Sequence, residues 1–224
     1  MKNLILSIFL VLVLAMPSWA GMVIGSGQPP ASGTTETFDK TVGYDLTWVE
    51  TVPAGNTIDE DYTTTTYNSS PQSLHITHTL GNSAESKTVY DIAGASTTKT
   101  ISFWLYIDSD TVVSDKIYIA TIGDVTSWYD HRAGLTLYLL LDTTMKIRIR
   151  GSGYSTSTFD IVTDAWREVK IDYVQNGNST LTYNGSSTTA ATYDIGADDL
   201  ALGFLVDADT TEVLDMVIDE VEIK

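Results

Sequence analysis

Apolar and polar residues alternate with a period of two along much of the chain. Within residues 165–185, Val169, Ile171 and Tyr173 alternate with charged residues, and apolar residues resume after the turn-forming stretch 175–178. A period of two is typical of a β-strand with one buried and one solvated face. Asparagine and glycine in the intervening stretch tolerate positive φ, so the chain can reverse there. The segment is therefore predicted to be a β-hairpin.

The same alternation recurs in short segments along the rest of the chain. Glycine, asparagine and serine separate these segments, and no amphipathic helix is apparent beyond the first twenty residues. We expect the Thr-rich segment 57–70 to be an exposed loop or an edge strand. Many short strands joined by turns predict an all-β fold, a two-sheet antiparallel jelly-roll sandwich. The strands are expected at residues 73–80, 100–107, 116–122, 134–141, 145–150, 158–163, 167–174, 179–184, 199–206 and 212–223.

The first twenty residues have a different pattern. Lys2 is followed by a largely apolar run, residues 4–15, and then by the small residues Ser18 and Ala20. This arrangement is typical of a secretory signal peptide, so residues 1–20 are predicted to form a helix before the fold and to be removed by cleavage after Ala20. The alternative is a retained anchor helix, because no charge interrupts the apolar run.

The rest of the chain divides into two parts. Residues 21–35 are rich in glycine, serine, proline and threonine, which predicts a flexible linker. Residues 36–224 are then expected to form one jelly-roll domain, a suitable length for a single large β domain. After cleavage of the leader we expect no membrane insertion. The protein is predicted to be secreted, periplasmic or located at a cell or virion surface.

Composition narrows the classes of partner. The chain has 29 Asp and Glu against 12 Lys and Arg, a formal net charge of −17, and it has no cysteine. Nucleic acid is not expected as a partner, because phosphate contacts supply most of that affinity. An acidic surface does attract divalent cations. Without cysteine there is neither a disulfide nor a lipoprotein anchor, which fits bacterial or phage-associated export.

Several of the predicted strands carry a family likeness when they are taken in order. The segments are ETFD (36–39), ISFWLYID (101–108), GLTLYLLLDTTMKIRIRG (134–151), DAWREVKIDYVQNGNSTLTYNG (164–185) and VIDEVEI (217–223). Together they resemble the concanavalin A-like lectin/glucanase superfamily, in particular its laminin G-like jelly-roll domains. The resemblance implies two stacked sheets, with the first and last segments paired. It also implies binding of glycans or proteins, often with calcium, although some members are glucanases or polysaccharide lyases.

Candidate catalytic groups are few. The resemblance implies a Glu-x-Asp-x-x-Glu strand in the glucanases, and this chain lacks that string. Glu220 and Glu222 share a strand face, as a catalytic pair would, and the alternative is a solvated acidic stripe. His75 and His78 are three residues apart, which on a strand places them on opposite faces, with His78 toward the core. We therefore expect no shared histidine metal site and, on balance, no catalysis.

A structural calcium ion is the candidate cofactor. Asp219 has the sequence parity of Val217 and Val221, which predicts that it faces inward, and a buried carboxylate needs a cation or several donors. Asp39 follows Phe38 on the opening strand, which is expected to lie beside the strand of Asp219. We hypothesise that Asp39 and Asp219, with backbone carbonyls, hold Ca²⁺; the alternative is that Asp219 accepts backbone N–H bonds. The acidic stretch 207–212 lacks the glycine of an EF-hand loop and is predicted to be a plain turn.

Aromatic and basic side chains suggest a sugar-binding surface. Trp104 and Tyr106 alternate with apolar residues, so they are predicted to lie on the open, concave face of a sheet. Lys146, Arg148 and Arg150 also alternate, and the two sets together would suit an anionic glycan such as a uronic acid or sulfated sugar. The alternative is that loops cover the aromatic rings and that the basic residues pair across strands with acidic residues at 168 and 172.

The loop 126–134 is a second candidate surface. It contains Trp128, Tyr129, His131 and Arg132 between two predicted strands, and loop aromatics often form binding sites. Taken together, the sequence predicts an exported, non-catalytic carbohydrate-binding domain that uses aromatic stacking and polar contacts. The alternatives are a structural, adhesion or virion-surface domain that binds a protein, and a polysaccharide hydrolase or lyase with an unrecognised site.

Overall fold

The structure is a computed structural model. It contains fifteen strands and no helix among the residues that it describes, and these residues all fall within one compact unit, Gly33–Lys224. In this described part there is also no helix that is long and apolar enough to cross a membrane. The described residues are 34–38, 46–52, 56–63, 72–78, 85–92, 97–114, 116–123, 135–194, 199–206 and 213–224. The predicted signal peptide lies outside them.

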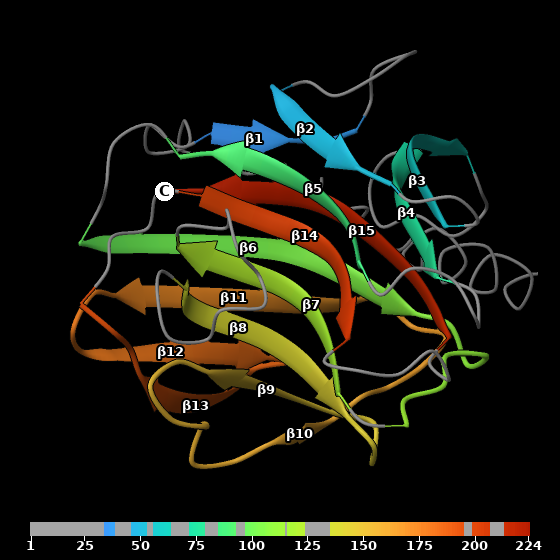
Figure 1. The fold of residues 1–224 in the computed structure, drawn as a ribbon. Coiled ribbons are helices and arrows are strands. Elements are labelled where there is room, and N and C mark those ends of the chain that lie inside the picture. The colour runs from blue at the N-terminus through green and yellow to red at the C-terminus, as the bar shows by residue number, and fades with distance from the viewer. Residues whose placement is uncertain are drawn as a thin grey trace, which may run out of the picture. The chain divides into compact units, whose positions relative to one another are not determined.

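The strands form two antiparallel sheets, which Figure 1 shows as two stacked layers. We call the larger sheet, with eight described strands, sheet A. Its order is β13 (Ser186–Ala191), β12 (Asn178–Tyr183), β11 (Arg167–Val174), β6 (Thr98–Ile107), β15 (Leu214–Ile223), β4 (Gln72–His78) and β3 (Thr57–Thr63), with β1 (Thr34–Glu36) paired to the end of β15.

The second layer, sheet B, has seven described strands. Their order is β10 (Phe159–Asp160), β9 (Lys146–Arg150), β8 (Leu135–Asp142), β7 (Lys116–Gly123), β14 (Asp199–Val206), β5 (Glu85–Asp91) and β2 (Trp48–Thr51). Several sequence neighbours lie in different sheets, for example β5, β6 and β7, so the chain crosses repeatedly between the layers. This is the predicted all-β jelly-roll sandwich.

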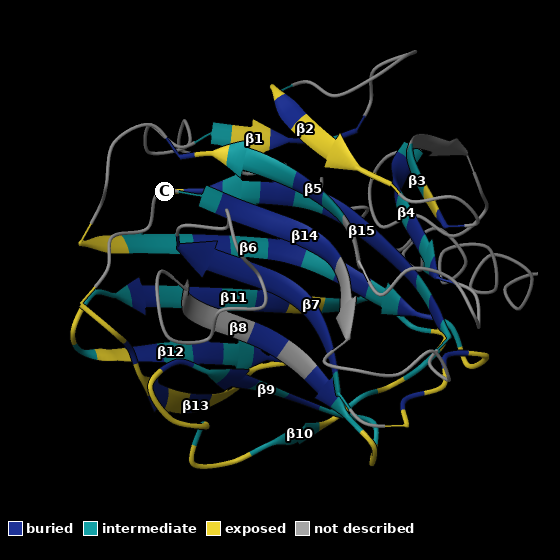
Figure 2. Ribbon diagram, viewed as in Figure 1, coloured by how far each residue is buried: buried dark blue, intermediate teal, exposed yellow. Residues whose placement is uncertain are grey.

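The core lies between the two sheets and is built from alternate residues of each central strand. Figure 2 shows the resulting stripes of burial along the strands. Sheet A contributes Ile101, Phe103 and Leu105 from β6, Val169 and Ile171 from β11, and Ile218 and Val221 from β15; sheet B contributes Ile117, Leu139, Leu141, Ile147, Ile149 and Leu202. His78 also belongs to the inward set of β4 and is 1% exposed, as its parity predicts.

Each of the ten predicted strands corresponds to an observed strand, and β3 lies at one edge of sheet A. The strands β2, β5 and β13 were not predicted. β13 has the sequence SSTTAA, which carries no large apolar side chain, and it forms by pairing with β12 through a tight turn. Asn184 and Gly185 in that turn have φ of 47° and 79°, as a type I′ hairpin turn requires. β1 begins at Thr34, inside the stretch expected as linker, and pairs with β15 as the resemblance implies.

One buried carboxylate connects the two sheets near the start of the domain. Glu36 of β1 is fully buried. Its carboxylate accepts hydrogen bonds from Phe38 N at 3.1 Å, Leu46 N at 2.8 Å and Trp48 Nε1 at 3.0 Å. Trp48 belongs to β2 of sheet B, so the side chain of Glu36 bridges from sheet A to sheet B. Three donors offset the cost of burying the charge.

We expect Glu36→Ala to destabilise the domain by about 3 kcal/mol, because it leaves two buried donors and one half-buried donor without this acceptor. Urea unfolding followed by tryptophan fluorescence measures the loss. Glu36→Gln is the control, since it keeps the shape and one acceptor oxygen and should lose less. Wild-type stability in Glu36→Ala would show that the bridge contributes nothing.

Candidate functional site

The outer face of sheet A carries the aromatic residues predicted for a binding surface. On β6, the residues that alternate with the core set are Ser102, Trp104 and Tyr106, and each is half-buried. The tryptophan and tyrosine therefore point away from the core and keep part of their rings exposed. Trp104 and Tyr106 thus share one face of sheet A, as their alternation in the sequence predicts.

A pocket of about 280 Å³ surrounds Trp104. Pairing within the sheet places Glu168 of β11 beside Trp104, and Glu222 of β15 beside Ser102. Glutamates therefore flank the indole from both neighbouring strands. We call this the Trp104 pocket; its lining is Thr35, Thr37, Ser102, Phe103, Trp104, Glu168, Glu220 and Glu222.

A β-bulge in β15 shapes one wall of the Trp104 pocket. The register between β15 and β6 shifts between Asp219 and Glu222. Glu220 occupies the bulge with φ of 51°, and its backbone N donates to Asp219 Oδ1 at 2.8 Å. A non-glycine residue rarely adopts this left-handed conformation, and bulges often re-aim side chains at functional sites. Here the bulge allows both Glu220 and Glu222 to line the same pocket.

Because of the bulge, Asp219 lies on the opposite face of β15 from the one that the sequence predicts. Asp219 pairs with the outward Trp104, whereas Ile218 and Val221 belong to the core. The expectation that Asp219 shares the face of Val221 is therefore wrong, because the extra residue reverses the parity of the strand. Asp219 is nevertheless fully buried.

The other predicted calcium ligand, Asp39, lies outside the described residues. Within the described ranges, no group of three or more histidine, aspartate or glutamate residues is placed to hold a metal ion. Asp219 supplies one buried carboxylate of the kind that calcium prefers. Calcium binding stays a prediction that needs Asp39 and backbone carbonyls to complete the ligand set.

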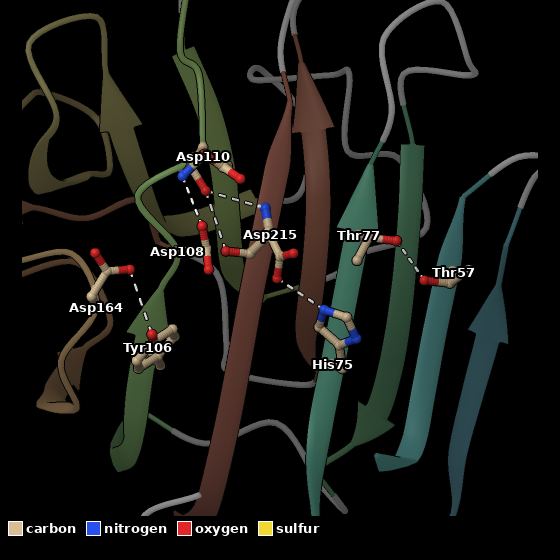
Figure 3. Close-up of polar contacts among 9 residues, drawn as sticks. Thr57, His75, Thr77, Tyr106, Asp108, Asp110, Asp164 and Asp215 are labelled. Atoms are coloured by element: carbon tan, nitrogen blue, oxygen red, sulfur yellow. Dashed lines mark hydrogen bonds and ion pairs between the residues drawn. The ribbon is translucent and has the colours of Figure 1, made fainter. Parts of the chain in front are cut away.

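Further along the same face, a histidine and a tyrosine lie in one row across three strands. Val217 of β15 is paired with His75 of β4 on one side and with Tyr106 of β6 on the other. His75 Nε2 donates to Asp215 Oδ1 at 2.9 Å, and Tyr106 OH donates to Asp164 Oδ1 at 3.5 Å (Figure 3). The sequence does not reveal that His75 and Tyr106 are neighbours, because periodicity does not give the order of strands in a sheet.

Burial and nearby acidic residues both raise the pKa of Tyr106. Partial burial, and then the charges of Asp164, Asp108 and Asp215, raise the pKa of its hydroxyl. The hydroxyl therefore remains a hydrogen-bond donor at neutral pH. The ring of Trp166 lies 5.7 Å from that of Tyr106 and extends the aromatic surface.

The predicted basic residues lie on the other sheet. Lys146, Arg148 and Arg150 belong to β9 of sheet B, on the side opposite to its core residues. The expectation that they share a sheet with Trp104 is therefore wrong. Their partners are Asp160 for Lys146 at 3.1 Å, Asp142 for Arg148 at 3.7 Å, and the Tyr154 ring, whose centroid lies 4.4 Å from Arg148 Cζ and 4.9 Å from Arg150 Cζ.

The alternative pairing of these basic residues with Glu168 and Asp172 is also wrong. Asp172 instead accepts from Lys170 Nζ at 2.9 Å and from Thr100 Oγ1 at 2.7 Å, both on sheet A. Burial acts to raise the pKa of Asp172, but these two hydrogen bonds and the Lys170 charge outweigh it and lower the pKa. Periodicity identified the faces of the strands but not the sheet to which each strand belongs.

The predicted loop site, Trp128, Tyr129, His131 and Arg132, lies outside the described residues. Sequence reasoning missed the contribution of Glu168 to the Trp104 pocket. It alternates with the core residues of β11, so the pattern gave its face, but the proximity to Trp104 follows from the pairing of β11 with β6.

Comparisons with known proteins support the fold. No protein-family model matches the sequence, and no curated protein is similar to it. Among solved structures, the chain resembles the cellulose-induced protein Cip1 (TM-score 0.66, 14% identity, 85% of this chain and 96% of the other). It also resembles an alginate lyase of polysaccharide lyase family 7, with a TM-score of 0.57 and 16% identity over 79% of this chain and 93% of the other. A third similar structure is the ligand-binding domain of botulinum neurotoxin serotype D in complex with N-acetylneuraminic acid, with a TM-score of 0.53 and 15% identity over 86% of this chain and 47% of the other. At this level of identity the likeness shows a shared jelly-roll fold.

If Glu220 is held in its conformation for the site rather than for stability, glycine should be tolerated there. Glu222 occupies an ordinary strand position, so Glu222→Gly should lower the free energy of unfolding by about 1 kcal/mol. We expect the change caused by Glu220→Gly to be smaller. Relief of the left-handed φ offsets the entropic cost of glycine only at the bulge. Paired urea titrations measure both variants, and a larger loss at Glu220 would contradict the argument.

Proposed function

We propose that this protein is an exported, non-catalytic carbohydrate-binding domain that holds a glycan on the outer face of sheet A. The observation that carries the proposal is the half-buried Trp104 in a pocket lined by three glutamates. The C–H faces of sugar rings pack on flat aromatic surfaces, and carboxylates accept strong hydrogen bonds from hydroxyls. A pocket that combines an apolar surface with a few polar groups is the usual form of a small-ligand site.

Two further arguments support the proposal. The solved structures with the same fold include proteins whose names refer to alginate or to bound N-acetylneuraminic acid. The ordered strand segments resemble concanavalin A-like and laminin G-like domains. The N-terminal sequence resembles a signal peptide, and on this basis the proposal includes a secreted, periplasmic or surface location.

We expect Trp104→Ala to reduce glycan affinity at least tenfold, since it removes the ring on which a sugar would stack while leaving the core of sheet A intact. A glycan array, followed by calorimetry with the best ligand, measures the effect. Tyr154→Ala is the matched control, because this tyrosine is 44% exposed but lies on the sheet B side. If Trp104→Ala and the wild type bind the glycan equally well, the binding site lies elsewhere. If no glycan binds, a protein-binding adhesion domain is favoured.

A second candidate function, polysaccharide cleavage, is favoured by the row of His75 and Tyr106. A histidine oriented by a carboxylate and a protonated tyrosine are possible proton acceptor and donor. Lyase chemistry, however, removes a proton next to a uronate carboxylate, whose developing charge needs stabilising cations or donors. The charges that act on Tyr106 are those of Asp164, Asp108 and Asp215, so we favour binding. New reducing ends or unsaturated products in the same polysaccharide panel would favour cleavage.

The proposed structural calcium has a direct test. If Asp219 and Asp39 hold Ca²⁺, EDTA should lower the melting temperature of the purified domain, because ligand binding to the folded state stabilises it. Asp219→Asn should remove the effect of EDTA. A melting temperature that does not respond to chelator, or to added calcium, would end the calcium hypothesis without affecting the glycan site.

A further inference from the structure

The charge of the Trp104 pocket carries an inference about its ligand that rests on the proposed function. We infer that this site selects glycans built from cationic amino sugars and rejects those built from uronic acids. The sequence alone suggests an anionic glycan, because it does not show that Trp104 and the basic residues of β9 lie on different sheets. The structure separates them, and this changes the sign of the charge that a bound sugar would meet.

Carboxylates are present at both ends of the outer face of sheet A. Glu168, Glu220 and Glu222 line the Trp104 pocket. Asp164 and Asp215 hydrogen-bond to Tyr106 and His75 further along the same face (Figure 3). A sugar that lies along β6 from the pocket toward Tyr106 would therefore have negative charge near it throughout.

Two lysines near the Trp104 pocket already form ion pairs with acidic residues. Lys170 Nζ lies 2.9 Å from Asp172 Oδ2, and Lys224 Nζ lies 2.8 Å from Glu222 Oε1. Neither lysine is therefore available to a uronate without breaking an existing ion pair. The pairing also means that one of the three pocket glutamates has its charge partly neutralised.

Glu168 provides the carboxylate for an ammonium group. Glu168 is exposed and is paired in register with Trp104. Its side chain lines the pocket and makes no hydrogen bond or ion pair with the residues that the structure describes. An ammonium group on a sugar stacked against Trp104 would thus find an uncommitted carboxylate beside the ring. The indole face also attracts cations directly. A uronate in the same position would meet repulsion from Glu168, and the nearby cations Lys170 and Lys224 are already in ion pairs with Asp172 and Glu222.

The experiment compares three soluble oligosaccharides with the full-length mature protein. They are oligomers of β-1,4-linked glucosamine, the same oligomers after N-acetylation, and oligomers of galacturonate. The first two share a backbone and differ in charge, so their comparison isolates the ammonium group. We expect the glucosamine oligomer to bind most tightly, its advantage to shrink as salt rises, and the galacturonate oligomer not to bind.

Two variants test whether the selectivity is local. Glu168→Gln should lower affinity for the glucosamine oligomer about fivefold, the upper range for an exposed charge pair, and leave affinity for the N-acetylated oligomer unchanged. Asp160→Asn is the matched control, because it removes one negative charge from an exposed position on sheet B. Equal losses in the two variants would show general attraction to an acidic protein and overturn the inference.

The outcomes also separate this inference from the proposed function. Binding of the N-acetylated oligomer that is lost in Trp104→Ala, with no preference for glucosamine, would keep the glycan site and overturn the charge selection. Tighter binding of galacturonate would likewise overturn it. Binding of glucosamine oligomers that does not depend on Trp104 would contradict both proposals, because the charge effect would then lie outside the pocket.

Discussion

The packing of sheet A against sheet B through one face of each central strand is the constraint on which the site depends. On β6, Ile101, Phe103 and Leu105 are almost completely buried between the sheets. Side chains alternate in direction, so Trp104 must point outward as long as Phe103 and Leu105 point inward. A slip of one residue would exchange the two sets and bury the polar one. The core thus determines the direction of the aromatic surface even though it contributes little to its chemistry.

The bulge in β15 interrupts this regular alternation beside the Trp104 pocket. The interruption adds Glu220 between the core residues Ile218 and Val221 without disturbing either. It requires a left-handed conformation that costs about 1 kcal/mol for a non-glycine residue. Residues kept in such conformations cluster at functional sites, and Glu220 lines the candidate pocket.

Local pattern is sufficient for the fold class and for the faces of β6 and β11, because burial imposes a period of two on each of these strands. It is insufficient for β13, whose serines, threonines and alanines carry no apolar signal, and which forms through pairing with β12. Asp219 shows a different limit of local pattern. Strict alternation assigns it to the face of Val221, but a bulge that the sequence does not reveal lies between the two residues. Arg148 shows a third, since the choice between sheets depends on contacts between segments far apart in the chain.

The separation of charge between the two sheets follows from these positions and limits what the domain can bind at one place. Arg148 and Arg150 alternate with the core residues Ile147 and Ile149, so they face outward from sheet B, while Trp104 faces outward from sheet A. The full thickness of the core lies between the two faces, about 10 Å from sheet to sheet. One sugar ring therefore cannot stack on Trp104 and pair with Arg148. Any charge selectivity at the aromatic surface must come from the carboxylates beside it. Glu168 and Asp219 are both in register with Trp104, and of these two Glu168 is the exposed one.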